Sequence, residues 1–491
     1  MTIRLSRAVL PSFPSKISVP NYSPKQLKPG IIHIGVGNFH RAHQAVYLDQ
    51  LFRLGKSLDW ALVGTGVMPG DRVMGQTLAQ QDYLTTVVEQ SAAGYKATIT
   101  GSMIDFLPPG DPVNIERLAD PSIRIVSLTV TEGGYFINPA TGEFDPDQPT
   151  LEQDAANPET PTTAFGLILA GLRTRLARGI APFTVMSCDN LLHNGNVTRN
   201  AVVGLAEMQD SKLAAWVERE VAFPNGMVDR ITPATSDRER SILQEEFGIE
   251  DGWPVFCENY IQWVLEDHFP LGRPELETVG VTFVPDVTPY EHMKLRILNA
   301  GHASIAYVGA LLDQHFVHEA MAHPLICRYL EKMETEEILP SVPPVPNTDL
   351  QAYLQLVLER FANPKIGDTI ARLCFDGSNR QPKFVLPSTR DRLQAGASVT
   401  GLALESALWC RYWGGFSEGG KDMQPEDSQA DRLRTLAERS KSELLAFLEL
   451  QDVFGDLSES KAFQQSFQNA LQHLWQHGTA NTLQSYLDDQ L

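Results

Sequence analysis

The first half of the sequence alternates short apolar runs with longer segments of helical period, such as Thr163–Ala177. Four apolar runs have the length and composition of buried strands: Ile31–Val36, Trp60–Val63, Ile123–Val130 and Phe183–Ser187. Strands that alternate with helices favour an α/β fold with a parallel, doubly wound sheet, because parallel neighbours must be joined by a crossover. Phe283–Pro289 is the last predicted strand and the exit from this region, so we expect one domain over residues 1–285.

The second half has a different pattern, in which long helical segments dominate. Five helices are predicted there: Glu291–Gln314, Asp349–Phe361, Leu402–Tyr412, Gln429–Leu448 and Ser460–His477. A proline-rich loop, Pro340–Pro346, separates the first two, and the polar stretch Ser417–Asp427 is expected to be a surface loop. We therefore expect a mainly α-helical second domain over residues 286–491.

Composition narrows the possible partners. The chain has 491 residues, of which 43% are hydrophobic and 20% charged, values typical of a globular protein with a large core. Its formal net charge of −20 disfavours nucleic acid, which requires a basic surface, and also anionic membranes. No uninterrupted run of about 18 apolar residues is present, so no membrane span is predicted. The expected partner is a small molecule, and no required protein partner is evident.

The cysteines indicate a reducing compartment. All five are scattered singly, and no pair has the C-x-x-C spacing of a zinc or redox site. Such an odd count without a framework is typical of reduced thiols in the cytosol. The first residues, MTIRLSRAVLPSFPSK, lack the apolar core of a signal peptide. We expect a cytoplasmic protein without a bound metal.

A G-x-G turn follows the first predicted strand. Such a turn lets the backbone approach a pyrophosphate, and the start of the next helix favours its negative charge. The third glycine of the usual G-x-G-x-x-G pattern is replaced by His40. The position directly after a strand of an α/β region nevertheless predicts a Rossmann-type dinucleotide site. Its expected cofactor-binding residues are Gly35, Val36, Gly37, Asn38, Phe39, His40 and Arg41.

Asp71 is the candidate for the acid that binds the adenosine ribose. This acid usually lies at the end of the second strand, about 20 residues after the glycines. Asp71 is the first acid after the predicted strand Trp60–Val63, but it lies further along the chain than that. A carboxylate there would accept bonds from the ribose and repel a 2′-phosphate, which favours NAD over NADP. Gly70 adds no second charge and Arg72 could tolerate a phosphate, so NADP stays open as a weaker alternative. Asp71 could also be a solvated loop residue.

Lys294, Asn299 and His302 interrupt the largely apolar stretch MKLRILNAGHASIAYVGALL. A helix that is apolar all round is a buried helix, and burial disfavours the charged form of a lysine. At about 100° per residue the three side chains fall within an arc of roughly 140°, and Arg296 falls outside it. They could form a site, or Lys294 could reach solvent while Asn299 and His302 are satisfied core residues.

Four segments together resemble one family. They are Gly35–His43, Thr184–Asn190, Met227–Pro233 and the helix of Lys294. In these residues, and over nearly the whole chain, the sequence resembles the polyol-specific long-chain dehydrogenases, also called the mannitol dehydrogenase family. The third segment is that family's signature. The resemblance implies a Rossmann domain followed by a helical domain, a site in the cleft between them, and oxidation of a secondary carbinol without metal.

The resemblance also assigns roles to individual residues. Lys294 matches the general base, and Asn190 and Asn299 match the pair that holds the reacting oxygen. The remaining matches are the polyol-binding positions His302 and Asp229, the proton-conducting acid Glu291, the substrate contact Arg372, and Val228 at the cofactor. Arg380 stands where mannitol-specific members have lysine, which keeps the charge but changes its reach and geometry.

Elementary chemistry agrees with these roles. The hydroxyl proton must leave as the carbonyl forms, and a desolvated lysine can take it near neutral pH. Two amide donors can stabilise the developing alkoxide, typically by about 3–4 kcal/mol each. Taken singly, each residue also has a structural reading. Asn190 could cap a turn, Asp229 and Arg230 could form an ion pair, and Arg372 and Arg380 could be surface charges beside a turn over Asp376–Asn379.

The sequence thus predicts metal-independent, NAD-dependent oxidation of a polyol, with D-mannitol and D-fructose as the first choice of substrate and product. The related fructuronate reductase is the main alternative, because Arg372, Arg380 and Lys383 could hold a sugar-acid carboxylate. Arabinitol and sorbitol are further candidates. A non-catalytic nucleotide sensor on the same fold is the alternative from another class, although it would have no reason to keep a buried base.

Overall fold

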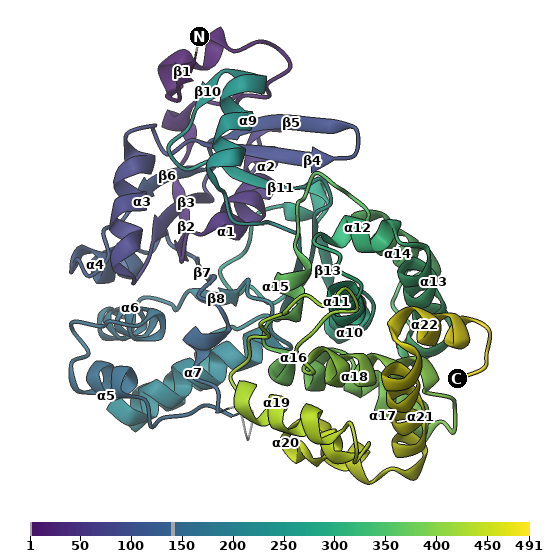
Figure 1. Ribbon diagram of the computed structural model, residues 1–491. Coiled ribbons are helices and arrows are strands. Elements are labelled where there is room, and N and C mark those ends of the chain that lie inside the picture. Colours follow the sequence, from purple (N-terminus) through teal and green to yellow (C-terminus); the bar gives the residue numbers. More distant parts are fainter. Residues whose placement is uncertain (1, 139–142) are drawn as a thin grey trace. The chain divides into compact units, whose positions relative to one another are not determined.

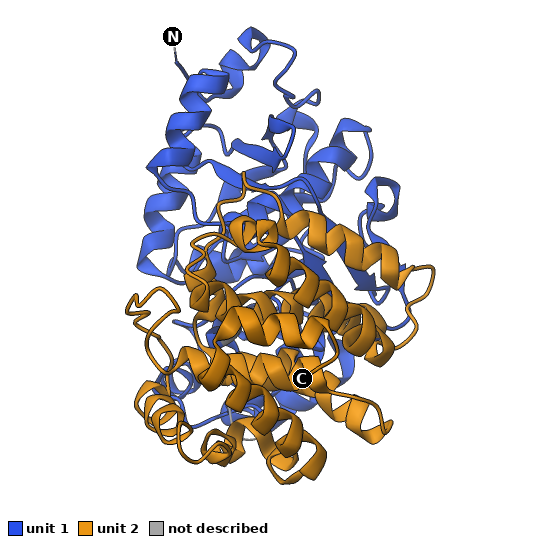
Figure 2. Cartoon of the chain, turned by 45° about the vertical axis from the view of Figure 1, so that its right-hand side comes forward, with its two compact units in different colours: residues 1–288 blue, residues 289–491 orange. Residues whose placement is uncertain are grey.

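The structure, a computed structural model, describes residues 2–138 and 143–491. The chain divides into two compact units, residues 1–288 and residues 289–491 (Figure 2). The domain boundary that we predicted from the sequence, after residue 285, lies between the last strand of the first unit and the first helix that leads into the second.

The first unit is built on a parallel five-stranded sheet with the order β6-β3-β2-β7-β8 (Figure 1). Its strands are β2 (Pro29–Ile34), β3 (Ala61–Thr65), β6 (Met103–Phe106), β7 (Ile125–Leu128) and β8 (Thr184–Ser187). The chain runs outward from β2 to one edge and then returns to its other side, so the order reverses at β2. The predicted doubly wound sheet is confirmed.

Both faces of this sheet are covered, which explains the continuous apolar runs in its strands. Ile31, Leu62 and Ile125 pack in one core with α2 (Gln44–Arg53) and α3 (Pro69–Ala79). Their neighbours Ile32, Val63 and Val126 pack in a second core on the opposite face. The helices of that face are α4 (Val113–Ala119), α6 (Ala164–Arg178), α7 (Asn194–Gln209) and α8 (Ser211–Glu220).

Several predicted ends are shifted. The first strand stops at Ile34 rather than Val36, because Gly35 has a φ of +90° that a strand cannot continue. The predicted strand Ile123–Val130 is shorter, Ile125–Leu128. Pro289 belongs to a helix, not to the exit of a strand. Thr163 is the N-cap of α6, and its hydroxyl accepts from the backbone N–H of Gly166 at 3.0 Å.

Smaller sheets complete the first unit, and only one of their strands, Thr282–Val284, overlaps a predicted strand, Phe283–Pro289. One has the order β11-β4-β5 and another β13-β12-β9. The strands are β4 (Thr85–Ser91), β5 (Gly94–Thr100), β9 (Gly226–Asp229), β11 (Val255–Glu258), β12 (Gln262–Glu266) and β13 (Thr282–Val284), with β1 (Ile3–Arg4) paired to β10 (Ile249–Glu250). The remaining helices of the unit are α1 (Asn38–Ala42), α5 (Pro149–Ala156) and α9 (Asp237–Phe247).

The second unit is built from helices, as predicted (Figure 2). They are α10 (Thr288–Met293), α11 (Ala300–Leu311), α12 (Val317–Ala322), α13 (Pro324–Met333), α14 (Leu350–Phe361), α15 (Ile370–Cys374), α16 (Gly377–Phe384), α17 (Leu386–Gln394), α18 (Thr400–Tyr412), α19 (Ala430–Arg439), α20 (Gln451–Phe454), α21 (Lys461–His477) and α22 (Thr479–Leu487). In the described residues no helix is long and apolar enough to cross a membrane.

Two predictions for this unit were wrong. The helix expected over Gln429–Leu448 ends at Arg439, and a short 3₁₀ helix, Ala446–Glu449, follows it. The turn expected over Asp376–Asn379 is the start of α16, so Arg380 lies on a helix. Asp376 has a φ of +57°, so the chain does turn at this residue, directly before α16 begins. The prediction of a turn was therefore right for Asp376 and wrong for the residues that follow it.

Candidate active site

The turn after β2 lies where the strand order reverses. Gly35 donates its backbone N–H to Thr65 O at the end of β3, at 2.9 Å. Gly37 in turn donates to Gly35 O at 2.7 Å, and α1 begins at the next residue. The turn therefore opens at the carboxyl edge of the sheet, the position at which α/β sheets bind their ligands.

Glycine stands at the two positions of the turn for different physical reasons. A Cβ on Gly35 would lie 2.1 Å from Thr129 O, and its positive φ also favours glycine. A Cβ on Gly37 would meet only Gly35 O, at 3.9 Å, and its φ of −87° suits any residue. Glycine at position 37 therefore serves to leave open space in front of the backbone, which fits a pyrophosphate that approaches closely.

The side chains of α1 turn partly inward. His40 and Arg41 are buried within the first unit. The Arg41 guanidinium donates to Gly37 O at 3.2 Å, to Asn38 Oδ1 at 2.6 Å and to Trp253 O, and burial lowers its pKa to about 10. Phe39 stacks on His43 with ring centroids 4.8 Å apart. These contacts brace the turn from behind, and direct contact of His40 and Arg41 with a cofactor stays a prediction.

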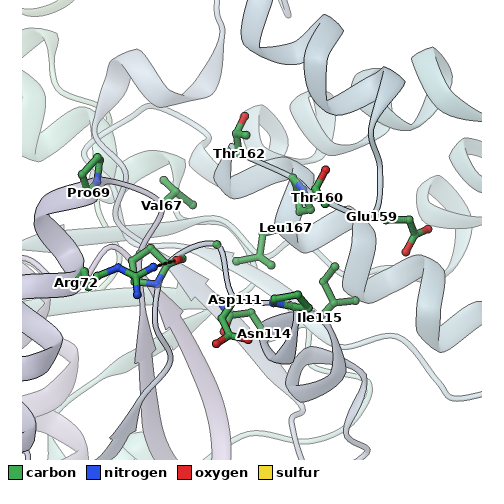
Figure 3. Close-up of a pocket in the computed structure, with 15 residues that line it drawn as sticks. Val67, Pro69, Arg72, Asp111, Asn114, Ile115, Glu159, Thr160, Thr162 and Leu167 are labelled. Carbon is green, nitrogen blue, oxygen red and sulfur yellow. Dashed lines mark hydrogen bonds between the residues drawn. The ribbon is translucent and has the colours of Figure 1, made fainter.

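A pocket of about 470 Å³ lies at the same edge of the sheet (Figure 3). The loops after β3 and β6 and the start of α6 form its walls. Among its lining residues are Gly66, Arg72, Pro109, Asn114, Thr162 and Leu167. Arg72 donates to Pro109 O at 2.8 Å and so ties the first two walls together. In a doubly wound sheet this is the side on which the nucleoside half of a dinucleotide would bind.

Asp71 lies beside this pocket with a structural role of its own. It is in the first turn of α3, where its Oδ2 accepts from the backbone N–H of Met68 at 2.9 Å. The carboxylate also lies against Gly66, where an added Cβ would be 2.0 Å from Oδ2. Asp71 is therefore no solvated loop residue. A bond from Asp71 to a ribose stays a prediction.

Asn190 follows β8 at the carboxyl edge of the sheet and is exposed. The loop that carries it is held by Asp189, which sequence reasoning missed. The Asp189 carboxylate accepts from the backbone N–H groups of Val130 and Thr131, at 2.9 and 3.1 Å, and from the Tyr135 hydroxyl at 2.6 Å. The loop after β7 and the loop after β8 are thereby joined next to the G-x-G turn.

Asp229 and Val228 lie at the end of β9, and both are buried. Val228 packs in the core that also contains Trp263. Arg230, the neighbour of Asp229, pairs with Glu89 at 2.8 Å and also donates to Ala42 O at 2.6 Å and Glu258 O at 3.0 Å. Arg230 thus has a charged partner from another strand, β4, which adjacency in the sequence does not indicate.

In the second unit, Lys294 and Asn299 are the ends of a π-helical segment, Lys294–Asn299, between α10 and α11. A π-helix has i→i+5 hydrogen bonds, so residues five apart lie roughly one turn apart on the same side. The arc of about 140° that an ideal α-helix predicts does not apply here, since the wider turn brings the two side chains closer. Lys294, Asn299 and His302 are only 7%, 9% and 7% exposed.

Arg296, the other charge of this segment, is directed elsewhere. Its guanidinium pairs with Asp391 of α17 at 2.6 Å and donates to Ser341 O. Glu291, on α10, is buried. Lys294 itself is buried, so the alternative in which its side chain reaches solvent is not supported.

His302 lies parallel to the Phe361 ring, with centroids 4.1 Å apart. Burial, and then the charges of Arg372, Arg380 and Arg360, hold its pKa well below the usual value, so the imidazole is neutral at pH 7. Among the described residues, His302 Nε2 and Asn299 Oδ1 have no hydrogen-bond partner. Buried polar atoms without a partner are uncommon, and here they leave one amide and one imidazole available to a ligand.

The two arginines differ in their partners. Arg372 is exposed and forms a two-bond pair with Asp368, at 2.6 and 2.5 Å. Arg380 donates to Leu373 O at 2.7 Å and lies over the Phe384 ring. Burial lowers the pKa of Arg380. The charges of Arg372 and Arg380 both lower the pKa of His302. The predicted polar residues of the second unit therefore lie around one buried helix.

The fold and these residues define a class of protein, a Rossmann-type dinucleotide-binding domain followed by a helical unit with a buried lysine. Comparison with known proteins gives the family. Residues 29–278 match the mannitol dehydrogenase Rossmann domain, and residues 286–475 match the mannitol dehydrogenase C-terminal domain. The chain belongs to the mannitol dehydrogenase family, as its sequence predicted.

Relatives are similar over their whole length. The chain is 56% identical to a mannitol 2-dehydrogenase of Cereibacter sphaeroides over 473 residues, 96% of this chain and 99% of that protein. The structure of Pseudomonas fluorescens mannitol 2-dehydrogenase, a ternary complex with NAD and D-mannitol, has a TM-score of 0.88 at 41% identity and covers 99% of this chain and 100% of that one. A substrate-free D-sorbitol dehydrogenase has a TM-score of 0.90 at 35% identity, with coverage of 98% and 100%.

Proposed function

We propose that this protein is an NAD-dependent polyol dehydrogenase that oxidises D-mannitol to D-fructose at a secondary carbinol without a metal. One observation carries the proposal: a lysine, an amide and a neutral imidazole are buried together on one largely apolar helical segment. The similarity to a protein solved with NAD and D-mannitol supports the choice of cofactor and substrate.

The residues of the first unit fit the cofactor. The open space at Gly37 would accommodate a pyrophosphate, and the pocket beside Arg72 would accommodate the adenosine. NAD, when bound, supplies the acceptor for the hydride that leaves the carbinol carbon. Asp71 would bind the ribose and disfavour NADP, so NADP is the weaker alternative.

The residues of the helix handle the proton. The Lys294 amine takes the proton of the reacting hydroxyl, a step for which general-base catalysis typically contributes 10²–10⁴-fold. The amides of Asn299 and Asn190 donate to the oxygen as it becomes a carbonyl. Glu291 passes the proton from Lys294 towards solvent.

The remaining polar groups hold the polyol. His302 is neutral and so can donate or accept a hydrogen bond without adding charge. Asp229, Arg372 and Arg380 would bind the other hydroxyls. The proposal includes a cytoplasmic location, which five free thiols support, and no required protein partner.

A substrate panel tests the function. D-mannitol, D-sorbitol, D-arabinitol and D-mannonate are each offered with NAD and with NADP, and absorbance of the reduced cofactor is followed. We expect the highest kcat/KM with D-mannitol and NAD. Preference for D-mannonate would replace the proposal by the fructuronate reductase alternative. Cofactor binding without oxidation of any compound would favour a sensor.

A further inference from the structure

His33 is the last residue but one of β2 and is fully buried. Its Nδ1 is 2.8 Å from Ser127 Oγ on β7, and its Nε2 is 2.9 Å from Thr129 Oγ1, just after β7. Nε2 is also 3.2 Å from Gly35 O. A histidine inside an apolar strand is a signal that sequence reasoning passed over.

The carbonyl of Gly35 is the common acceptor. It receives the Thr129 hydroxyl at 2.6 Å and the Gly37 N–H at 2.7 Å, in addition to its contact with His33. Burial lowers the pKa of His33 to about 3, so the ring is neutral and protonated on one nitrogen. With that proton on Nε2, His33 donates to Thr129 Oγ1 and Thr129 donates to Gly35 O. In this tautomer the His33 Nε2–H, the Thr129 hydroxyl and the Gly35 carbonyl each have a partner, while Ser127 Oγ, beside His33 Nδ1, donates to Gln44 Oε1 at 3.0 Å.

His40 closes the other side of His33. The two rings are stacked with centroids 3.4 Å apart and planes inclined by 16°, and His40 is buried as well. His40 comes from α1, and Ser127 and Thr129 come from β7 and its end (Figure 1). His33, on the strand before the turn, therefore contacts the strand beside it and the helix after the turn.

We propose that His33 and Thr129 are positioning residues for the cofactor turn, which hold the Gly35 carbonyl so that the backbone at Gly37 faces the pyrophosphate. This inference rests on the proposed function, because it assumes that the turn binds NAD. It predicts that the Thr129 hydroxyl matters for cofactor affinity although it need not touch the cofactor. The hydride and proton steps occur elsewhere, so turnover at saturating NAD should be spared.

A matched pair of variants tests the hydroxyl. Thr129→Val keeps the shape and removes the hydroxyl, whereas Thr129→Ser keeps the hydroxyl. NADH affinity is measured by fluorescence titration, and KM for NAD and kcat are measured with D-mannitol. We expect Thr129→Val to weaken NADH by roughly threefold to tenfold, the effect of one hydrogen bond, with kcat within about twofold. Thr129→Ser should stay within about twofold of wild type in both.

A second readout does not depend on activity. Hydrogen exchange of the segment 31–41, measured without cofactor, should be faster in Thr129→Val and unchanged in Thr129→Ser. Thr184→Val is the control. Thr184 is a buried threonine at the amino end of β8, the strand beside β7, whereas Thr129 follows the carboxyl end of β7. Ser127→Ala, which removes the partner of His33 Nδ1, should give a smaller shift in the same direction and replaces Thr129→Val if that variant does not fold.

The outcomes distinguish a failure of the positioning role from a failure of the proposed function. Wild-type affinity for NADH in both Thr129→Val and Ser127→Ala, or equal losses in Thr129→Val and Thr129→Ser, would overturn the positioning role while the proposed function stands. Failure of the wild-type protein to bind NADH at all would overturn the proposed function and the inference with it.

Discussion

Among single residues, Lys294 has the most demanding proposed role. We predict that Lys294→Ala keeps the fold and NADH binding but lowers kcat for D-mannitol by roughly 10²–10⁴-fold, the usual contribution of a general base. The rise of activity with pH that reports ionisation of the base should disappear as well. Steady-state kinetics between pH 6 and 10 provide the measurement. A variant that keeps more than about a tenth of the turnover would exclude the role.

Asp71 has two roles to separate at the residue scale, because its carboxylate caps the start of α3 and is also the proposed ribose ligand. Asp71→Asn keeps an oxygen for the Met68 N–H and removes the charge. We expect it to weaken NAD by roughly ten- to a hundredfold, as loss of a charged hydrogen bond would, and to improve NADP. Asp71→Ala should in addition destabilise the protein by about 1 kcal/mol through the lost cap. Unchanged kinetics of Asp71→Asn with both cofactors would leave only the cap.

At the scale of elements, the turn between β2 and α1 predicts opposite behaviour for its two glycines. Gly37→Ala should leave the melting temperature nearly unchanged, because the added Cβ points into open space, yet weaken NADH strongly. Gly35→Ala should lower the melting temperature, because its Cβ would collide with Thr129 O. Thermal unfolding and NADH titration of both variants check this. Tight NADH binding by Gly37→Ala would place the pyrophosphate elsewhere.

The packing of α16 against α18 predicts a pH dependence of stability. Glu405, on α18, is fully buried and receives a hydrogen bond from Gln381 at 2.6 Å. Burial raises its pKa from 4.5 to about 8, so the folded protein holds this proton where the unfolded chain has lost it. This group therefore lowers the unfolding free energy as pH rises from about 4.5 to 8.

Glu405→Gln should remove that loss, because the amide cannot ionise. We expect the variant to gain roughly 4 kcal/mol over wild type between pH 5 and pH 8.5, since the pKa of Glu405 is raised from 4.5 to about 8 and one pKa unit corresponds to about 1.4 kcal/mol. Urea unfolding at the two pH values measures it. Parallel pH dependence of the two proteins would mean that Glu405 does not titrate in this range.

At the scale of the whole molecule, the prediction concerns metal. In the part of the chain that the structure describes, no group of three or more His, Cys, Asp or Glu side chains is arranged to hold a metal ion. We expect prolonged dialysis against a chelator to leave kcat for D-mannitol unchanged. Activity that is lost on dialysis and restored by zinc would reveal a catalytic metal and contradict a lysine-based mechanism.

Features that depend on near neighbours in the chain could be predicted from the sequence. Consecutive residues of β2 and β3, such as Ile31 and Ile32, are apolar because both faces of the sheet are covered, so these strands could be predicted from continuous apolar runs. The helices predicted over Thr163–Ala177 and Ser460–His477 match α6 and α21 to within one residue, and Thr163 and Ser460 are their N-caps. The parallel topology followed from the alternation of strands and helices, because a crossover requires it.

Only the tertiary structure decided the features that depend on distant partners. Arg41 is buried because it donates to Trp253 O, 212 positions away, and Arg230 pairs with Glu89, 141 positions away. The π-turn that brings Lys294 and Asn299 to one side leaves no mark in a helical pattern, since an apolar helix looks alike at either period. The physical reason is common to all of these cases. Hydrogen bonds and charges are satisfied by whichever group the fold brings near, and sequence spacing alone does not contain that information.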